Sequence, residues 1–276
     1  MKDYTIAVLG CGVMGTAVTS AILKTKFDPY PAKIICCTGS ETSAKNLTAK
    51  LDGGDLIETS FGKESNNKAV ARADVIILGC KPFMCEEVYN QVKDSLTGKQ
   101  LVISLLAGWT IEQLRIFSPY IARVMTNTPA QFGCGMAVVS FSPEAEEEYQ
   151  DLVMKLTDPV GKAIKLPEKN MDAATSLVGS GPAFCLLVME ALIDGGVRMG
   201  IPFAAAKECA AKVMEGTAKM VIETGEHPAV LRSKVCTPGG TTIGGLMKME
   251  DAGVRSGIAR GVEEAANIAT SLGKKK

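Results

Sequence analysis

A glycine-rich turn near the N-terminus constrains the fold more than any other feature of this sequence. Gly10, Gly12 and Gly15 follow the pattern G-x-G-x-x-G. An apolar run at residues 5–9 precedes the turn, a helical pattern begins within it, and a second apolar run follows at residues 33–37. Strand, turn, helix and strand in this order predict a dinucleotide-binding unit. Its first glycine permits the tight turn, the second lets the backbone approach a pyrophosphate, and the third allows close packing of helix on strand.

The chain before Pro167 alternates short apolar runs with amphipathic stretches. The apolar runs are rich in Val, Ile and Leu and lack polar alternation, as expected of parallel strands that are covered on both faces. Strands are expected at residues 5–9, 33–37, 75–79, 101–105, 121–125, 136–141 and 163–166. Helices are expected at residues 14–23, 42–51, 85–94, 111–117 and 144–156. This alternation predicts a doubly wound, Rossmann-like α/β sheet.

After Pro167 the strand-like runs vanish and the sequence becomes helical. Helical stretches are expected at residues 170–199, 203–224, 242–248 and 257–272. The first is too long and too apolar for the surface of a small domain, so we expect it to pack against another helical layer, including one from a second subunit. The sequence therefore predicts an α/β domain over residues 1–167 and an all-helical domain over residues 168–276.

Composition excludes several classes of function. Lys and Arg number 30 and Asp and Glu number 30, and this balance argues against nucleic-acid or anionic-membrane binding. No uninterrupted apolar run approaches about 20 residues, so no membrane span is expected. The 9 cysteines include no C-x-x-C pair and mostly lie in apolar runs, which favours a reducing, cytoplasmic location. A single histidine, His227 in a predicted turn, excludes a multi-histidine metal site, and no metal is expected.

The end of the second strand bears on the choice of cofactor. NAD enzymes usually place Asp or Glu there to bind the ribose 2′-hydroxyl. Here Thr38 and Ser40 supply hydroxyl groups, and no carboxylate stands before Glu41. NADPH is therefore favoured. NADH remains possible, because the turn has no Arg and Lys45 would have to reach in.

Two further glycine motifs lie in the helical half. Residues 237–242 read Thr-Pro-Gly-Gly-Thr-Thr and lead into a helix, so their N–H groups can form an anion site without arginine. A plain glycine turn with a threonine cap has the same geometry. Residues 179–182, Gly-Ser-Gly-Pro, lack the spacing of a nucleophile elbow and predict close helix packing, which leaves open whether Ser180 takes part in catalysis.

Several longer motifs occur together and in order. They are Ala-Asp-Val-Ile-Ile-Leu-Gly-Cys-Lys-Pro at 73–82, Ser-Leu-Leu-Ala-Gly at 104–108, Val-Met-Thr-Asn-Thr-Pro at 124–129, Leu-Val-Gly-Ser-Gly-Pro-Ala at 177–183 and Thr-Pro-Gly-Gly-Thr-Thr-Ile at 237–243. With the fingerprint, they make the chain similar to the pyrroline-5-carboxylate reductase family from Ile6 to about Ser271. The wording Cys-Lys-Pro-Phe and Ala-Gly-Trp-Thr-Ile resembles the fungal branch.

The resemblance implies an NADPH-dependent reduction of 1-pyrroline-5-carboxylate to L-proline, the last step of proline biosynthesis. It implies a homodimer or higher oligomer whose active site lies between one subunit's cofactor domain and helices that include the partner's. The implied cofactor-binding residues are Gly10, Cys11, Gly12, Val13, Met14, Gly15, Thr38, Ser40, Asn66, Lys81, Pro82, Ala107, Gly108 and Asn127. The implied substrate-binding residues are Thr126, Asn127, Pro238, Gly239, Gly240, Thr241 and Thr242.

Within this implied site, Thr242 lies nearest the ring nitrogen and is the expected catalytic residue. Some members support that threonine with a glutamate, where this chain has Gly225 followed by Glu226. The chemistry agrees with the residues present: a protonated imine is already electrophilic, so the protein has mainly to position the reactants. The sequence leaves open whether Lys81 contributes.

Two alternative functions predict different sequence features. A reductase of this architecture that acts on a 3-hydroxy acid or another imine is expected to carry a lysine deep in the long helix of the second domain, and residues 174–194 contain none. A non-enzymatic NADP-binding regulator would bind cofactor without turnover, and it would have no reason to keep the Pro-Gly-Gly-Thr-Thr loop.

Overall fold

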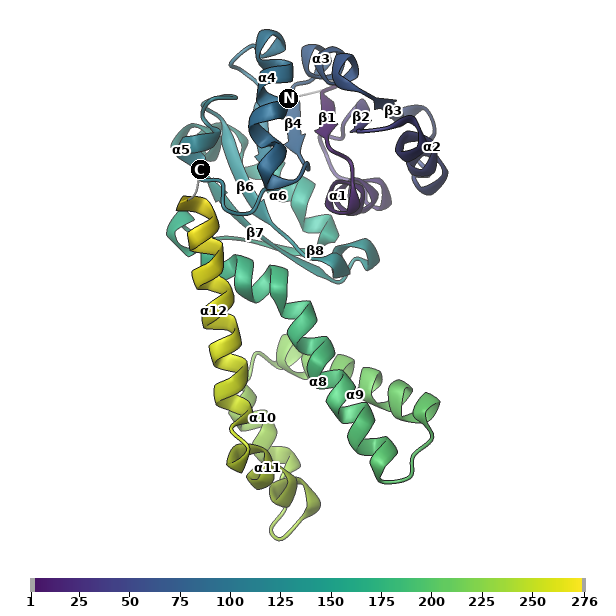
Figure 1. Ribbon diagram of the computed structural model, residues 1–276, viewed down its shortest axis with the longest axis vertical. Coiled ribbons are helices and arrows are strands. Elements are labelled where there is room, and N and C mark those ends of the chain that lie inside the picture. Colours follow the sequence, from purple (N-terminus) through teal and green to yellow (C-terminus); the bar gives the residue numbers. More distant parts are fainter. Residues whose placement is uncertain (1–2, 275–276) are drawn as a thin grey trace. The chain divides into compact units, whose positions relative to one another are not determined.

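The computed structural model describes residues 3–274 and forms two compact units (Figure 1). The first comprises Met1–Ser180 with Glu264–Lys276, and the second comprises Gly181–Glu263. The first unit thus extends beyond the predicted domain of residues 1–167, because it includes the first turns of the helical region and the last turns of the chain. Thr270 Oγ1 donates to Asp172 Oδ2 at 2.9 Å and joins those two segments.

The first unit is built on a sheet of eight strands in the order β3-β2-β1-β4-β5-β6-β7-β8. The strands are β1 (Thr5–Leu9), β2 (Lys33–Thr38), β3 (Ile57–Phe61), β4 (Val75–Leu78), β5 (Leu101–Ser104), β6 (Ile121–Met125), β7 (Gly135–Phe141) and β8 (Gly161–Lys165). The first six positions in this order are parallel, as predicted. The carboxyl ends of β1, β2, β4, β5 and β6 therefore lie at one edge of the sheet.

The direction of β7 corrects the expectation of a wholly parallel sheet. It runs antiparallel to β6, and β8 is parallel to β7. Only the short 3₁₀ turn η4 (Thr128–Phe132) joins β6 to β7. A parallel crossover needs a dozen or more residues, usually a helix, so the chain turns back on itself instead.

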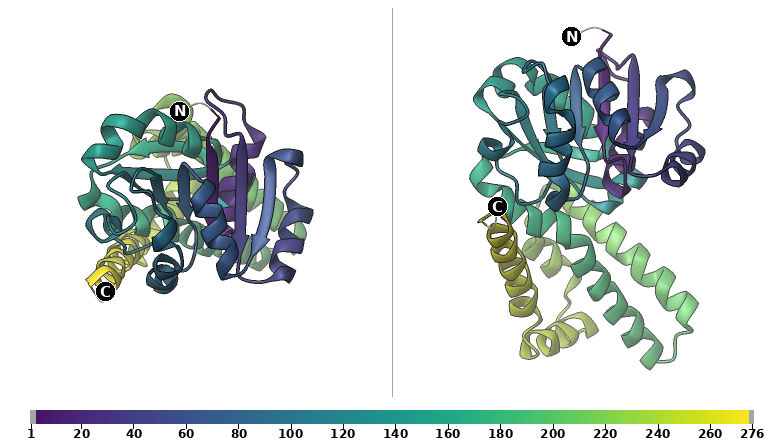
Figure 2. Two further views of the ribbon diagram at one scale, coloured as in Figure 1. Left: turned by 90° about the horizontal axis from the view of Figure 1, so that it is seen from above. Right: turned by 45° about the horizontal axis from the view of Figure 1, so that its top comes forward.

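Helices cover both faces of the sheet (Figure 2). Side chains of α1, α2 and α6 join one apolar cluster with alternate strand residues such as Ile6 and Val8. Side chains of α3, α4 and α5 join another cluster with Ala7 and Leu9. The bounds are α1 (Val13–Lys24), α2 (Glu41–Lys50), α3 (Lys63–Arg72), α4 (Cys85–Val92), α5 (Ile111–Leu114) and α6 (Pro143–Thr157).

The start of the helical region packs on the sheet. The 3₁₀ turn η6 (Glu168–Asn170) leads into α7 (Met171–Ala174) and then a π-helical turn, Thr175–Ser180. A Cβ on Gly179 would lie 3.4 Å from Met125 Sδ, an ordinary van der Waals distance, so the close packing predicted for this motif stays a prediction. Pro182 follows in the first turn of α8, and because it has no N–H to donate, it sits where the helical hydrogen-bonding pattern changes.

The second unit consists of helices. Its elements are α8 (Gly181–Arg198), α9 (Phe203–Thr224), α10 (Pro228–Val235), α11 (Thr241–Asp251) and the first part of α12 (Val254–Lys274). α8 and α9 lie side by side and share a small apolar cluster around Ile193, Ala206 and Ala210 (Figure 1). The turn expected at His227 caps α10, since its Nδ1 accepts a hydrogen bond from the N–H of Ala229 at 3.1 Å.

Large apolar side chains remain uncovered on these helices. Leu186 and Leu187 of α8 are 61% and 66% exposed. By length and composition alone, the continuous helical segment Glu168–Arg198 is long and apolar enough to cross a membrane. The polar residues that interrupt its apolar runs do not end the helix, and the expectation that no segment spans a membrane stays a prediction. The segment is poorly covered within one chain, as the sequence predicted for a helix that packs on another layer.

Candidate active site

The fingerprint turn is held by backbone contacts to its neighbours. Gly10 adopts φ +84°, and a Cβ there would lie 2.6 Å from Cys80 Cα. A Cβ on Gly15 would lie 3.1 Å from the carbonyl oxygen of Gly10. The first and third glycines are therefore required by close approaches within the chain. The Cβ position of Gly12 has no atom within 4 Å, so that side of the turn is open.

The open side faces the N-terminus of α1. Gly12 is the N-cap of α1 and has no side chain with which to cap the free N–H groups. Val13, which follows it, is 77% exposed. Unpaired N–H groups and the positive end of the helix dipole favour an anion such as a pyrophosphate here. The bare backbone at Gly12 and these free donors fit a dinucleotide.

The Cys11 side chain is buried beneath the turn and does not form part of its exposed surface. Its N–H donates to the carbonyl oxygen of Cys37 at 2.8 Å, and its buried thiol lies 4.0 Å from Thr19 Oγ1. The Cys36 thiol hydrogen-bonds that of Cys11, which lowers the pKa of Cys11 and, together with burial, raises the pKa of Cys36. Burial raises the pKa of Cys37 to about 11. These contacts join the turn after β1 to β2.

The loop after β2 turns its threonine inward. Thr38 is 8% exposed, and its hydroxyl lies 3.0 Å from the carbonyl oxygen of Ser40 and 3.2 Å from that of Ser60. Ser40 caps α2 by accepting from the N–H of Ser43, and its own hydroxyl donates to Ser43 Oγ at 2.9 Å. The Ser43 hydroxyl is therefore the free donor of this group, and sequence reasoning missed it.

Charge at the same loop is balanced locally. Glu41 pairs with Lys45 at 2.7 Å on the exposed side of α2. A cavity of about 600 Å³ lies beside the fingerprint and is bordered by Gly12, Val13 and Ser43. The lysine that the sequence suggested for a 2′-phosphate thus already has a carboxylate partner, whereas Ser43 faces the cavity.

Two loops at the centre of the sheet edge are tied together. Lys81 and Pro82 follow β4, and Lys81 Nζ lies 5.8 Å from the centre of the exposed Phe83 ring. Gly108, which follows Ala107 after β5, adopts φ +73°. The indole N–H of the next residue, Trp109, donates to the carbonyl oxygen of Pro82 at 2.9 Å.

The segment after β6 contains a buried side-chain hydroxyl that has no hydrogen-bond partner within residues 3–274. The Thr126 hydroxyl is buried, with the residue 6% exposed, and it is the one buried side-chain oxygen or nitrogen without a hydrogen bond among the described residues. Buried polar groups normally have partners. Asn127 uses its Oδ1 to accept from the N–H of Met136 at 3.2 Å, which leaves its NH₂ group for another acceptor. Asn66 on α3 uses its NH₂ to donate to Gln91 Oε1, which leaves its oxygen as an acceptor.

The remaining predicted residues belong to the second unit. Gly239 adopts φ +67°, and a Cβ on Gly240 would lie 2.4 Å from Thr237 Oγ1. Gly240 is the N-cap of α11, which begins at Thr241, so Thr242 lies in its first turn beside free N–H groups. Gly225 ends α9 in a left-handed conformation, and the carboxylate of Glu226 binds Lys234 Nζ at 2.7 Å.

The structure thus gathers the predicted cofactor residues at one sheet edge and places the substrate loop in the other unit. Among the described residues, no group of three or more His, Cys, Asp or Glu side chains is arranged to hold a metal ion. The residues at the edge are Gly10, Cys11, Gly12, Val13, Met14, Gly15, Thr38, Ser40, Asn66, Lys81, Pro82, Ala107, Gly108, Thr126 and Asn127.

Strand order 3-2-1-4-5-6, a glycine-rich turn at α1 and free donors at the carboxyl edge define an NAD(P)-binding oxidoreductase fold. Known proteins agree. Residues 5–108 match the family model "NADP oxidoreductase coenzyme F420-dependent", and residues 168–272 match "Pyrroline-5-carboxylate reductase dimerisation". A pyrroline-5-carboxylate reductase from the fungus Kluyveromyces lactis is 49% identical over 286 residues, covering 100% of both chains. This chain belongs to the pyrroline-5-carboxylate reductase family.

Solved structures agree on the fold. A pyrroline-5-carboxylate reductase from Coxiella burnetii superposes with a TM-score of 0.86 at 26% identity, covering 98% of this chain and 99% of that one. A pyrroline carboxylate reductase from Plasmodium falciparum with NADP bound gives a TM-score of 0.84 at 24% identity and covers 99% of both chains. The predicted α/β domain followed by an all-helical dimerisation region is confirmed.

Proposed function

We propose that this chain catalyses the NADPH-dependent reduction of 1-pyrroline-5-carboxylate to L-proline in the cytoplasm, as a homodimer or higher oligomer. The observation that carries the proposal is the end-to-end similarity to a reductase of this name. The uncovered apolar face of α8, around Leu186 and Leu187, supports self-association through the region that matches the dimerisation model.

The substrate offers a carboxylate and a cyclic imine, and one ring carbon separates the carboxylate from the imine nitrogen. The free N–H groups at the start of α11, after Gly239 and Gly240, suit the carboxylate without a cationic side chain. Thr242 in the same turn then has its hydroxyl beside the ring nitrogen, where it can hydrogen-bond the imine and the developing amine. Orienting the two reactants in this way can supply about 7–11 kcal/mol of the barrier.

The cofactor side is assigned to the edge of the sheet. When bound, NADPH supplies a hydride, which carries both electrons of the reduction. Within the fingerprint, the N–H groups of Val13, Met14 and Gly15 in the first turn of α1 suit its pyrophosphate, and Asn66 offers an oxygen to the adenosine ribose. We assign the buried Thr126 hydroxyl and the free NH₂ group of Asn127 to the nicotinamide end, because their unused donors suit a polar ligand there.

Preference for NADPH over NADH rests on the loop after β2. Ser43 offers a free hydroxyl at the N-terminus of α2, and Ser40 holds it in place. The Thr38 hydroxyl points into the loop, so we give this residue the task of shaping the loop rather than contacting the phosphate. An NADP oxidoreductase model matching residues 5–108 supports the same preference.

Consumption of NADPH in the presence of 1-pyrroline-5-carboxylate tests the proposal, with formation of proline measured in the same reaction. NADH and a 3-hydroxy acid serve as comparison cofactor and substrate. NADPH binding without turnover of the imine would instead favour a non-enzymatic role. Equal rates with NADH would remove the NADPH preference and leave the reaction itself in place.

A further inference from the structure

The only tryptophan in the sequence, Trp109, forms a bridge between two loops. Its side chain is 5% exposed, and its indole N–H donates to the carbonyl oxygen of Pro82 at 2.9 Å. That oxygen also accepts from the N–H of Cys85, the residue at which α4 begins. With two donors on one carbonyl oxygen, the first turn after β4 is fixed against the loop after β5.

The bridge lies directly behind residues assigned to the cofactor. Pro82 follows Lys81, and Trp109 follows Ala107 and Gly108 in the chain. Because β4 and β5 are neighbouring parallel strands, these two loops form adjacent walls at the carboxyl edge of the sheet. The hydrogen bond therefore sets the separation of the two walls.

Packing holds the indole ring in this position. The ring belongs to the apolar cluster that includes Cys85, Val88, Ile111 and Phe117. That cluster includes residues of α4, α5 and the segment after α5, so the ring is buried in a core to which elements after both loops contribute. Because the ring is buried and its N–H group donates to Pro82, the position of the loop after β5 restrains the position of the loop after β4.

We propose that Trp109 is a positioning residue for the nicotinamide-ribose half of the cofactor. The inference rests on the proposed function, because it takes the loops after β4 and β5 as the walls of that half-site. Trp109 itself is buried and acts through the Pro82 carbonyl. It should leave the phosphate-binding turn around Gly12 unaffected.

The test compares the whole cofactor with a fragment of it. In Trp109→Phe the ring remains and the N–H is lost, while Cys85 still satisfies the Pro82 oxygen, so the protein should fold. The dissociation constant for NADPH, measured by calorimetry on the full-length protein, should rise about three- to tenfold, because binding must then order the two loops that this hydrogen bond held in the free protein. The dissociation constant for adenosine 2′-phosphate 5′-diphosphate, which lacks nicotinamide and its ribose, should stay unchanged.

A matched variant separates positioning from packing. Phe117→Leu alters a buried ring of the same cluster that packs edge-on against Tyr89, and it should lower thermal stability without changing either dissociation constant. Equal weakening of NADPH and the fragment by Trp109→Phe, or no weakening of either, would overturn the proposal. So would a Phe117→Leu variant that reproduces the selective loss.

A second replacement covers the case in which Trp109→Phe does not fold. Since Trp109 is the only tryptophan, growth on the isosteric analogue with sulfur in place of the indole NH changes this position alone. The same selective loss of NADPH affinity is expected, and its absence would overturn the proposal. Lack of imine turnover by the wild-type protein would instead contradict the proposed function, since the two binding measurements do not depend on the substrate.

Discussion

Arg123 Nη1 donates to Glu168 Oε1 at 2.7 Å, and this ion pair joins the sheet to the first residue of the helical region. The Arg123 side chain is only 6% exposed, on the strand that ends just before Thr126. The same carboxylate oxygen accepts from the N–H of Ile111 at 2.6 Å, at the start of α5. One carboxylate thus connects β6 with the segments that follow β5 and β8.

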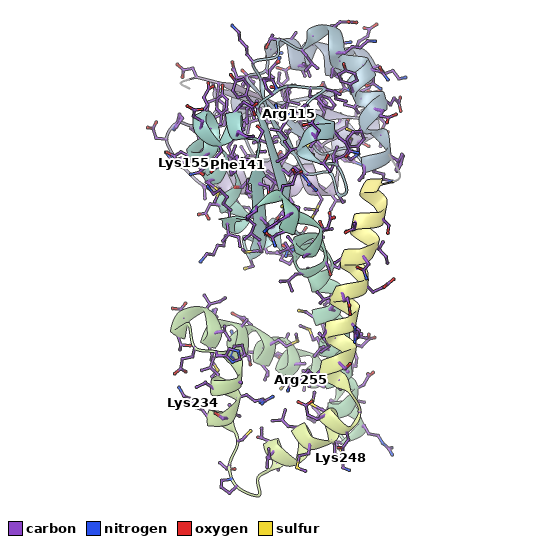
Figure 3. All side chains as sticks on the ribbon, turned by 90° about the vertical axis from the view of Figure 1, so that its left-hand side faces the viewer. Arg115, Phe141, Lys155, Lys234, Lys248 and Arg255 are labelled. Carbon is purple, nitrogen blue, oxygen red and sulfur yellow. The ribbon has the colours of Figure 1, made fainter. Side chains whose placement is uncertain are left out.

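Removing that carboxylate should destabilise the protein. Glu168→Ala leaves the buried Arg123 cation without its partner, and we expect a loss of about 3 kcal/mol in the free energy of unfolding. Glu168→Gln keeps an acceptor and should lose about half as much. Urea unfolding at one fixed protein concentration measures both. Glu112→Ala, which removes an exposed partner of Arg115 (Figure 3), should change little, and an equal loss there would contradict the role of Glu168.

Replacing two glycines of the fingerprint by alanine should affect different properties, folding in one case and cofactor binding in the other. Gly10→Ala introduces a Cβ at φ +84° and 2.6 Å from Cys80 Cα, so it should impair folding. Gly12→Ala meets no atom within 4 Å and should fold with nearly unchanged thermal stability. It should nevertheless bind NADPH about tenfold or more weakly, because its methyl group fills the side open to the pyrophosphate. Wild-type affinity in a folded Gly12→Ala variant would contradict this placement.

Much of the first unit could be predicted because its strands are buried on both faces. Apolar runs such as residues 75–78 and 121–125 have no polar alternation and stand out locally. β3 (Ile57–Phe61) was missed, since this edge strand reads Ile-Glu-Thr-Ser-Phe and is only partly buried. α3 (Lys63–Arg72) was missed because only Ala69 and Val70 of its residues are buried. The direction of β7 depends on a connection that apolar periodicity does not describe.

The candidate site likewise has features that the sequence predicted and features that it did not. The glycine turns were predictable, since glycine in fixed spacing marks a backbone requirement that is local to the turn. The inward orientation of Thr38, the free hydroxyl of Ser43 and the bond from Trp109 to Pro82 depend on partners from other segments or on the geometry of a folded loop. No local sequence pattern signals such contacts. The assignment of residues to ligand stays a prediction.

The choice of cofactor should depend on Ser43 more than on Thr38. Ser43→Asp places a carboxylate beside the proposed 2′-phosphate and should weaken NADPH about tenfold or more while affecting NADH little, because like charges repel. Thr38→Val removes a buried hydroxyl that faces two carbonyl oxygens, so it should affect both cofactors alike. Steady-state kinetics with each cofactor distinguish the two. Equal losses in Ser43→Asp would show that the 2′ position lies elsewhere.

Self-association should depend on the exposed apolar face of α8. Leu187 is 66% exposed in one chain, and a lysine there would carry a charge into an apolar contact. Leu187→Lys should therefore shift the protein toward monomer in light scattering and lower activity in parallel. Lys68→Glu on α3 of the first unit serves as the control and should leave the mass unchanged. A fully active wild-type monomer at assay concentration would contradict the proposed oligomer.

The hydroxyl of Thr242 should carry the polar contact to the ring nitrogen of the substrate. It lies in the first turn of α11, directly after the glycines whose geometry frees the N–H groups proposed to hold the carboxylate. A hydrogen bond to a charged partner contributes about 1.5–3 kcal/mol, and each 1.4 kcal/mol or so is a factor of ten in rate. Thr242→Ala should therefore lower kcat/KM about ten- to a hundredfold and leave NADPH affinity nearly unchanged. Thr242→Ser keeps the hydroxyl and should retain most activity. If both variants lose activity alike while folding and NADPH binding persist, the residue acts through the packing of its methyl group, and the hydroxyl has no part in the reaction.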